Sequence, residues 1–484
     1  MPGTRESSLI AAVASALLQG AALIVFAVLS HLLPPAELGA YRQVLVIQSI
    51  VTIVAAMGIP TAMLYLVGRT SSREEGASAY GASLLWLFVS TLLCGALAGV
   101  SILAAAAYFQ NDILVRCAFV GAVCAAASVH ALFIGPILLS KRAARMFFWF
   151  AAAQTTLSVL ASWLWVRSDA RVETALLAAA VSGAFGWLSS VMLLLRASQG
   201  SRAREWIGRL RSALRYGGPV ATSSALYTLS YQIDHFVALR FLAPLEYAIY
   251  AAGAWQVPVG PLVQRAQADV LLPLLSEHHS RGRRTEFWAE WSRLIVPWAA
   301  VGAALFWAVF PAADDIVIVL LGDRFAASAA VLRVYTLMLP LRMAAFTLPL
   351  RAVGVTMLDV FACIAFGVIS FLVGRAAVAP LGLVGPAVGV AVGYSVWVAV
   401  NLIGTARILD TRLGVMLPLR QLGGTMAVAA VAAIPAWALS HLWSSKPSLA
   451  RLVIYVGVYG IVLAGMLAFA FREHRRRSLT AEPV

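Results

Sequence analysis

The stretch Leu29-Ser-His-Leu-Leu-Pro-Pro-Ala-Glu-Leu-Gly-Ala-Tyr41 ends one long apolar run and begins the next. A second stretch, Leu239-Arg-Phe-Leu-Ala-Pro-Leu-Glu-Tyr-Ala-Ile-Tyr250, does the same later in the chain, with Pro, Glu and Tyr at the same offsets. The two stretches are six apolar runs apart. The pattern predicts a duplicated six-helix unit, and because six is even, both copies would have the same orientation in a membrane. The alternative is a chance similarity between two short hairpins.

Composition indicates a membrane protein along the whole chain. Hydrophobic residues make up 61% of the 484 positions and charged residues only 12%, and the mean hydropathy is +0.87. A soluble domain carries roughly a quarter charged residues, so this chain has too few charges to cover a soluble surface. Runs such as 11–29 and 452–471 are continuously apolar and lack the alternation of a membrane β-barrel. The sequence therefore predicts an all-α integral membrane protein.

The apolar runs have the length of membrane spans. A spanning helix needs about 20 apolar residues, and the chain contains about fourteen such runs. We expect the first run to be a retained helix, because it is longer than the core of a signal peptide. The run at 327–350 contains Arg333 and Arg342 and is the least regular. The predicted spans are 8–30, 43–67, 80–108, 113–139, 146–166, 174–195, 216–242, 247–275, 292–320, 327–350, 358–379, 381–405, 416–442 and 450–471.

Basic residues are distributed unevenly over the loops. With the N-terminus inside, roughly two thirds of the 36 Lys and Arg residues fall on cytoplasmic segments, where membrane proteins carry their excess of positive charge. We therefore expect a protein of the bacterial cytoplasmic (inner) membrane with both termini in the cytoplasm. Its basic loops should meet anionic lipid head groups, and nucleic acid is not an expected partner.

Short motifs follow one another in a fixed order along nearly the whole chain. They are Leu32–Tyr41, Gly58–Pro60 with Ala62, Tyr216–Pro219, Ile233–Asp234, Pro273–Ser276, and Leu320–Gly322 with Phe325 and Ala327. In this order they resemble the multidrug/oligosaccharidyl-lipid/polysaccharide flippase superfamily, specifically its polysaccharide-transport branch, which includes the O-antigen (Wzx-type) flippases. The chain departs from the branch at His235, where members often have a basic residue after the acid.

The resemblance implies both an architecture and a cargo. Two six-helix lobes, residues 1–205 and 206–412, would surround a central cavity, and residues 413–484 would add two further helices and a basic cytoplasmic tail. The implied cargo is an oligosaccharide on a polyprenyl pyrophosphate, moved across the membrane by alternating access for the synthesis of O-antigen, capsule or exopolysaccharide. The expected partners are this glycolipid, membrane lipids and other membrane proteins of polysaccharide assembly.

Polar residues within or at the ends of spans are the candidates for cargo binding. An ionisable side chain at the centre of a span costs about 2.5–3.5 kcal/mol on insertion, so the few that occur suggest a function. Guanidinium groups bind phosphate with paired donors and stay charged, although an arginine at a span end is also a common interface anchor. The candidate substrate-binding residues are Arg42, Gln48, Tyr227, Tyr231, Arg240, Arg265 and Arg342.

Two carboxylates, Asp234 and Asp269, are the candidates for ion coupling. A carboxylate inside a span could exchange a proton during the transport cycle, because the surrounding low dielectric disfavours its charged form. Asp234 could instead pair structurally with His235 or Arg240. Asp269 lies four residues after Arg265 on the same expected helix, and the two could also pair.

Two other classes of function stay open. A cation-coupled drug exporter of the same superfamily would favour carboxylates over arginines in its cavity, and Asp234 and Asp269 are compatible with that class. A membrane glycosyltransferase or polymerase usually has a long extramembrane loop, but the longest loops here, near 196–215 and 276–291, are short and basic. The sequence has no phosphate-binding glycine loop, metal-binding His cluster or nucleophile elbow. We therefore expect no enzymatic activity, no cofactor and no metal site.

Overall fold

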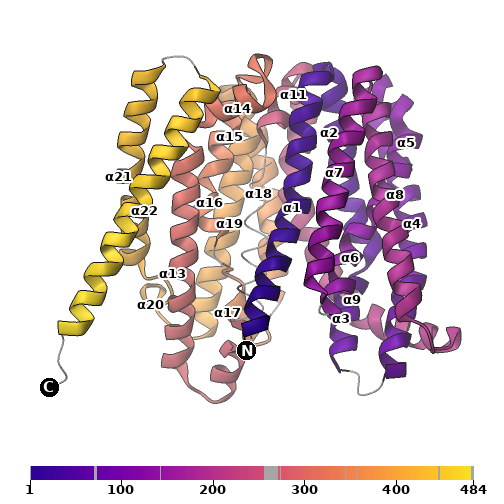
Figure 1. Cartoon of the computed structure of the whole chain (residues 1–484), viewed down its shortest axis with the longest axis horizontal. Helices are drawn as coiled ribbons and strands as arrows, with labels where there is room; N and C mark the ends of the chain where they lie inside the picture. Colours follow the sequence, from indigo (N-terminus) through magenta and orange to yellow (C-terminus); the bar gives the residue numbers. More distant parts are fainter. Residues whose placement is uncertain are drawn as a thin grey trace.

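The computed structural model describes residues 2–69, 73–141, 143–254, 267, 271–272, 274–343, 345–355, 357–444 and 447–480. Every regular element within these residues is a helix, which confirms the predicted all-α class. The helices stand side by side as a bundle of long rods, and Figure 1 shows both chain termini at the same end of that bundle.

The helices of the first part of the chain lie together on one side of the bundle (Figure 1). They are α1 (Pro2–Leu32), α2 (Pro35–Ala56), α3 (Ile59–Arg69), α4 (Arg73–Phe109), α5 (Asp112–Ser128), α6 (His130–Ser140), α7 (Ala144–Ser168) and α8 (Val172–Ala197).

The second part of the chain continues through the middle of the bundle, and its last two helices form the far edge (Figure 1). Its elements are α9 (Ala203–Tyr231), α10 (Ile233–Phe241), α11 (Pro244–Gly253), α13 (Arg284–Val309), α14 (Ala313–Leu321), η1 (Asp323–Phe325), α15 (Ser328–Leu337), α16 (Leu339–Arg342), α17 (Leu348–Ala352), α18 (Met357–Leu381), η2 (Gly382–Val384), α19 (Gly385–Ile408), α20 (Leu413–Met416), α21 (Leu419–Trp443) and α22 (Leu449–Thr480).

Ten segments of the described chain are long and apolar enough to cross a membrane. One of them, Met357–Ile408, contains two predicted spans, because only the short turn η2 separates α18 from α19. Most of the predicted span 247–275 lies outside the described residues. The predicted spans 216–242 and 327–350 are not among these segments, and both carry polar residues and helix breaks. Such features are tolerated where a span is surrounded by other helices instead of lipid.

Two of the passes through the bundle are broken at identifiable residues. Between α2 and α3, Met57 (φ 48°) and Gly58 (φ 66°) both adopt the left-handed conformation, which stops the helix and restarts it in a new direction. In the pass at 327–350, Pro340 and Pro349 each begin a new short helix, α16 and α17. Proline cannot continue a helix, because it lacks the backbone donor and clashes with the preceding turn.

The start of α9 packs against the first helices of the chain. Trp206 and Leu210 lie against an apolar core that includes Ile59, Leu87 and Phe133. Further along, Tyr227 and other residues of α9 pack instead with the core formed by α18 and α19. The helix α9 therefore connects the two sides of the bundle.

The two sides meet where α2 crosses α11, at the end of the bundle opposite the termini. Gly39 and Ala248 lie four residues after Pro35 and Pro244, so they are equivalent positions of the predicted repeat. A Cβ atom built on Gly39 would lie 3.3 Å from the Cβ of Ala248. Contact between equivalent residues is what a two-fold relation between repeats produces at its axis.

Two hydrogen bonds join the first and second parts at this same end. Arg324 Nη2 donates to the Leu33 carbonyl at 2.9 Å, and Ser30 Oγ donates to the Leu320 carbonyl at 3.4 Å. The last carbonyls of a helix have no partner inside it. The C-terminal end of α1 is therefore capped by a side chain from η1.

A backbone contact joins the two parts nearer the termini. A Cβ atom built on Gly58 would lie 2.3 Å from the Gly217 carbonyl oxygen, and one built on Gly217 would lie 2.7 Å from the Met57 carbonyl oxygen. No side chain fits in this space without moving the backbone. The break between α2 and α3 therefore lies directly against α9.

Candidate functional site

Arg342 is a buried cation inside the helix bundle. It ends the short helix α16 and is only 4% exposed. Its guanidinium carbon lies 4.5 Å from the centroid of the Tyr231 ring, and the guanidinium also interacts with the Tyr227 hydroxyl. A cation over an aromatic face is attracted by the ring quadrupole, and the attraction grows when water is removed. The two tyrosines of α9 therefore offset part of the cost of burying this charge.

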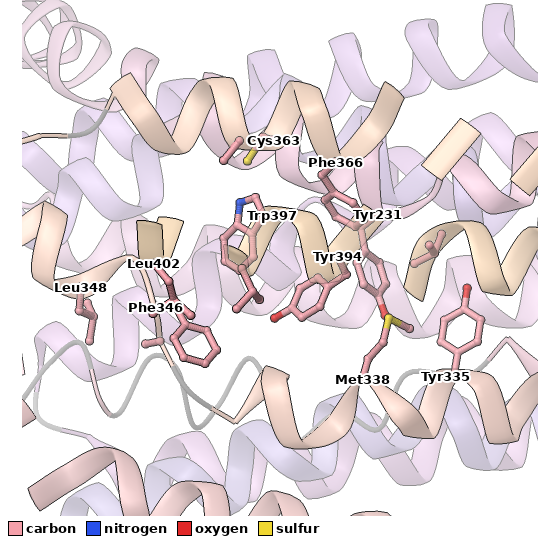
Figure 2. Packing of buried hydrophobic residues seen from close by; sticks show 14 of the residues in the cluster. Tyr231, Tyr335, Met338, Phe346, Leu348, Cys363, Phe366, Tyr394, Trp397 and Leu402 are labelled. Atoms are coloured by element: carbon pink, nitrogen blue, oxygen red, sulfur yellow. The ribbon is translucent and has the colours of Figure 1, made fainter. Parts of the chain in front are cut away.

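The wall around Arg342 is aromatic. Figure 2 shows Tyr231, Phe366, Tyr394 and Trp397 gathered close together, with Tyr335 on the neighbouring helix segment. The ring centroids of Tyr394 and Trp397 are 5.3 Å apart in a stacked arrangement, and those of Tyr231 and Phe366 are 6.2 Å apart, edge to face. These rings come from α9, α18 and α19, so three separate passes supply one continuous wall.

Asp234 lies at the start of α10 and is fully buried. The hydroxyls of Tyr250 on α11 and Tyr335 on α15 both donate hydrogen bonds to its Oδ2 atom. Among the described residues, no donor reaches its Oδ1 atom. A buried carboxylate is stable only where donors or cations surround it. Asp234 thus accepts hydrogen bonds from two phenolic hydroxyls at Oδ2, and its Oδ1 atom can still accept another.

Arg42 brings a second positive charge to this region from the first part of the chain. It is half-buried on α2 and interacts electrostatically with Asp234, His235 and Tyr247. His235 is 1% exposed, and its Nδ1 atom lies 3.4 Å from the Tyr247 hydroxyl. We refer to Arg42, Tyr227, Tyr231, Asp234, His235, Tyr247, Tyr250, Tyr335, Arg342 and Tyr394 as the buried charge cluster.

The buried charge cluster lies at the seam between the two parts of the chain. Next to Asp234, Gln232 joins α9 to α10, and its Nε2 atom donates to Ser49 Oγ of α2 at 3.3 Å. The cluster combines two guanidinium groups, one carboxylate and several phenolic hydroxyls. Such a set can bind a charged, polar group and release it again without covalent chemistry.

The structure brings together five of the predicted site residues. Tyr227, Tyr231 and Asp234 come from the consecutive helices α9 and α10, Arg42 comes from α2, and Arg342 comes from α16. Tyr231 interacts electrostatically with Asp234 and with both arginines. Tyr227 and Tyr231, four residues apart on α9, therefore both face the Arg342 guanidinium.

The remaining predicted residues lie elsewhere or outside the described residues. The side chain of Gln48 faces the first helices, where its Oε1 accepts a hydrogen bond from the Cys124 thiol at 3.7 Å. Arg240 is exposed, and its guanidinium carbon lies 5.6 Å from the Phe241 ring centroid, at the mouth of a separate cavity. Arg265 and Asp269 are outside the described residues.

The residues that sequence reasoning missed are mostly tyrosines. Tyr250 had a signal, since it ends the second repeated stretch, but nothing in the sequence connected it with Asp234. Tyr335 and Tyr394 are single tyrosines within apolar runs, and such residues usually pack without any role in binding. Only the three-dimensional arrangement shows that their rings and hydroxyls surround the charges.

Comparisons with known proteins agree with this architecture. Residues 5–279 match the family described as polysaccharide biosynthesis protein. No curated protein matches the sequence significantly.

Several solved structures share the fold. An inward-facing multidrug resistance MATE family transporter of the MOP superfamily matches with a TM-score of 0.64 at 15% identity, covering 82% of this chain and 94% of its own. The lipid II flippase MurJ in an inward closed conformation matches with a TM-score of 0.62 at 12% identity, covering 97% and 98%. A MOP superfamily transporter from Pyrococcus furiosus, described as having a binding pocket of reverse polarity, matches with a TM-score of 0.59 at 14% identity, covering 85% and 96%. These likenesses confirm the predicted fold, an all-helical multi-pass membrane fold that the chain shares with these transporters.

Proposed function

The chain belongs to the polysaccharide biosynthesis protein family and has the fold of a MOP superfamily transporter, not of an enzyme, and from this premise we propose that it flips a lipid-linked oligosaccharide. The cargo is an oligosaccharide on polyprenyl pyrophosphate, moved from the inner to the outer leaflet of a bacterial cytoplasmic membrane for the assembly of a surface polysaccharide. In this proposal the chain crosses the membrane an even number of times, with both of its termini in the cytoplasm.

The observation that carries this proposal is the pair of arginines in the buried charge cluster. A pyrophosphate bears its charge on two adjacent phosphate groups, and each guanidinium can offer paired donors to one of them. Arg342 is buried among tyrosines, and Arg42 approaches the same Tyr231 from α2. Phenolic hydroxyls can donate further hydrogen bonds to phosphate oxygens, and the aromatic wall offers apolar faces to sugar rings.

An apolar cavity at the edge of the bundle supports a lipid cargo. It has a volume of about 920 Å³ and lies between α13, α21 and α22, where Val301, Val428 and Met466 are among its lining residues. The neighbouring part of α22 is fixed to α13 by Tyr459, whose hydroxyl donates to the Ala304 carbonyl at 3.0 Å. A polyprenyl chain could lie in this cavity at little cost, because most of its lining residues are apolar.

Contacts at both ends of the seam support alternating access. At the end opposite the termini, Gly39 contacts Ala248 and Arg324 caps α1, and at the other end Gly58 contacts Gly217. A cargo site between two such contacts opens to one side when one contact separates and the other stays closed. In the proposed cycle the moving lobes are residues 1–205 and 206–412, while residues 413–484 supply the edge helices.

The membrane potential has the right sign to assist this movement. With the cytoplasm negative, outward transfer of an uncompensated negative charge gains about 2.3 kcal/mol per 100 mV. Asp234 is the proposed coupling group, since its Oδ1 atom has no donor among the described residues. A proton or cation bound there would alternate with the anionic cargo.

Asp234 also supports a second candidate, a cation-coupled multidrug exporter. In that function the carboxylate would bind the coupling ion or a cationic drug, and the arginines would not be required. Drug susceptibility distinguishes the two functions. An exporter confers resistance to cationic dyes that depends on Asp234 and leaves the surface glycan unchanged.

The proposed function is tested by deleting the gene in its own host and complementing the deletion. The deletion strain should lose surface polysaccharide and accumulate lipid-linked oligosaccharide in the inner leaflet, and the wild-type gene should restore export. Arg342→Ala should not restore export although the protein inserts normally. The matched control is Arg333→Ala, an arginine of the same broken pass that pairs with the partly exposed Asp314. Normal export by Arg342→Ala would refute the proposed site.

A further inference from the structure

A polar cavity of about 700 Å³, separate from the apolar cavity described above, lies at the end of the bundle opposite the termini. Its walls are the start of α2, the turn between α4 and α5, and the junction of α10 with α11. Both parts of the chain therefore contribute to it. Arg240, a predicted phosphate ligand, lies here and not in the buried charge cluster.

Polar groups of several kinds line this cavity. Asn111 caps α5 by accepting the Ile113 N–H through Oδ1 at 3.0 Å, so the cap uses its oxygen and not its amide donors. Asp112 and Arg240 are exposed and place one negative and one positive charge on the wall. The two charges balance each other, which makes the cavity poorly suited to a multiply charged anion.

An aromatic platform stands beside these polar groups. Tyr108 is 68% exposed although it lies in the cavity wall, and its ring meets Phe109 edge to face with centroids 4.9 Å apart. An exposed ring held by a neighbour offers a flat apolar face to a ligand at little cost in conformational freedom.

Gln43 indicates that the cavity has a ligand. This residue of α2 lines the cavity and is only 7% exposed, yet no described residue donates a hydrogen bond to its buried Oε1 atom. Buried amide oxygens are normally paired, and an unpaired one calls for an explanation. A ligand hydroxyl that donates to Oε1 would complete this site.

We propose that this cavity binds the sugar part of the cargo through its hydroxyl groups, an inference that rests on the proposed function. Vicinal sugar hydroxyls act as donors and acceptors at once, and they match a wall of amides with one carboxylate. The apolar face of a sugar ring packs on an aromatic ring such as Tyr108. The occupant is thus an uncharged or weakly charged saccharide, and the pyrophosphate belongs to the buried charge cluster.

Tyr247 connects the two sites. It lines the cavity, and its hydroxyl lies 3.4 Å from His235 Nδ1, next to Asp234 in the chain. One glycolipid can therefore place its pyrophosphate at the buried charge cluster and its first sugars in the cavity. The glycan then contributes to binding at the end through which it leaves, and the cavity selects among glycans.

The test uses the free oligosaccharide, released from the host's own polysaccharide by mild acid and carrying neither lipid nor pyrophosphate. Its binding to the purified full-length protein in lipid nanodiscs is measured by calorimetry. Saturable binding by the wild type is expected, weakened about tenfold or more, or about 1.4 kcal/mol, in Gln43→Leu and in Tyr108→Ala. Phe119→Ala is the control, because Phe119 is an exposed ring on α5 outside the cavity.

Thermal unfolding separates a binding role from a structural one. Gln43→Leu removes an unpaired buried amide, so it should unfold at the same temperature as the wild type or higher. Unchanged binding by both variants, or no saturable binding by the wild type, overturns the inference.

Failure of the proposed function gives a different result. If the wild type binds the free oligosaccharide through Gln43 but does not export the glycolipid, the flippase proposal falls and the saccharide site stands. If export depends on Arg342 while Gln43→Leu and Tyr108→Ala bind and export normally, only the saccharide site falls.

Discussion

Gly39 of α2 and Ala248 of α11 occupy equivalent positions in the two copies of the predicted repeat and pack directly against each other. The crossing is close because Gly39 has no side chain and Ala248 has only a methyl group. It lies at the end of the molecule that must open to release cargo outward in the proposed cycle.

Enlarging Gly39 should keep the two halves from closing at this crossing. We expect Gly39→Leu to lower the free energy of unfolding by about 1–3 kcal/mol, the usual cost of overpacking, and to reduce glycan export. Gly20→Leu is the control, since a Cβ atom built on Gly20 has nothing within 4 Å. Thermal unfolding and export assays provide the two measurements. Equal stability and equal export of Gly39→Leu and Gly20→Leu would show that close contact at the crossing is not required.

The contact nearer the termini offers a comparison of adjacent glycines. Gly217 touches the backbone at Met57 and Gly58, whereas a Cβ atom built on Gly218 has nothing within 4 Å. Gly217→Val should force α9 away from the break between α2 and α3 and stop export, while Gly218→Val should have little effect. A Ser49→Cys reporter in inverted vesicles should react faster with a thiol reagent when Gly217 is replaced. No difference in its reaction rate would mean that the contact does not gate the seam.

The two tyrosines bonded to Asp234 should stabilise its charged form. Replacing both by Phe leaves a buried carboxylate without these donors, and we expect a loss of about 1–3 kcal/mol in stability. Adding Asp234→Asn to this pair should recover part of the loss, because an amide carries no charge to stabilise. Thermal unfolding of the single, double and triple variants measures the coupling.

The same carboxylate gives a transport prediction. Asp234→Asn should transport cargo slowly in proteoliposomes and should lose the dependence on external pH that a proton-coupled wild type shows. Full activity with an unchanged pH dependence would remove Asp234 from the mechanism.

A buried ion pair fixes the last two helices to the rest of the bundle. Arg451 Nε donates to both carboxylate oxygens of Asp315 at 2.8 Å, and the two side chains are 5% and 3% exposed. Arg451→Met alone removes the guanidinium partner of the buried Asp315 carboxylate and should cost about 3–5 kcal/mol, whereas adding Asp315→Leu should recover most of this loss. The exposed pair of Arg281 with Glu277 is the control and should contribute about 0–1 kcal/mol.

The elements that follow from local sequence could be predicted. The apolar runs identified the helices because the bilayer requires that length. The two similar stretches that contain Glu37 and Glu246 begin the helices α2 and α11, which cross in the structure. Even there, the equivalent acids act differently. Glu37 pairs with Arg116 and accepts the Val172 N–H, whereas Glu246 caps its own helix by accepting the Ala243 N–H. A motif indicated where these residues lie but not their partners.

The candidate site was harder to predict, because its contacts join distant parts of the chain. Tyr227, Tyr231 and Asp234 lie three or four residues apart, so helical spacing alone brings them near one another. Asp234 of α10 meets Tyr335 of α15, which lies 101 residues later in the chain. No local pattern connects residues so far apart. The charge of Arg240 predicts a phosphate ligand, and its position at the end of α10 places it in the wall of another cavity.

The cap that Arg324 places on the end of α1 bears on how readily the molecule opens. When the two parts of the chain separate at this end, water can donate to the Leu33 carbonyl and hydrate the guanidinium, so the hydrogen bond is replaced and not simply lost. The crossing of Gly39 with Ala248 instead packs methyl and methylene surface, which separation would expose to water. Opening this end therefore costs little at the cap and more at the crossing. The apolar contact between these two residues would then set how long the molecule stays closed at this end.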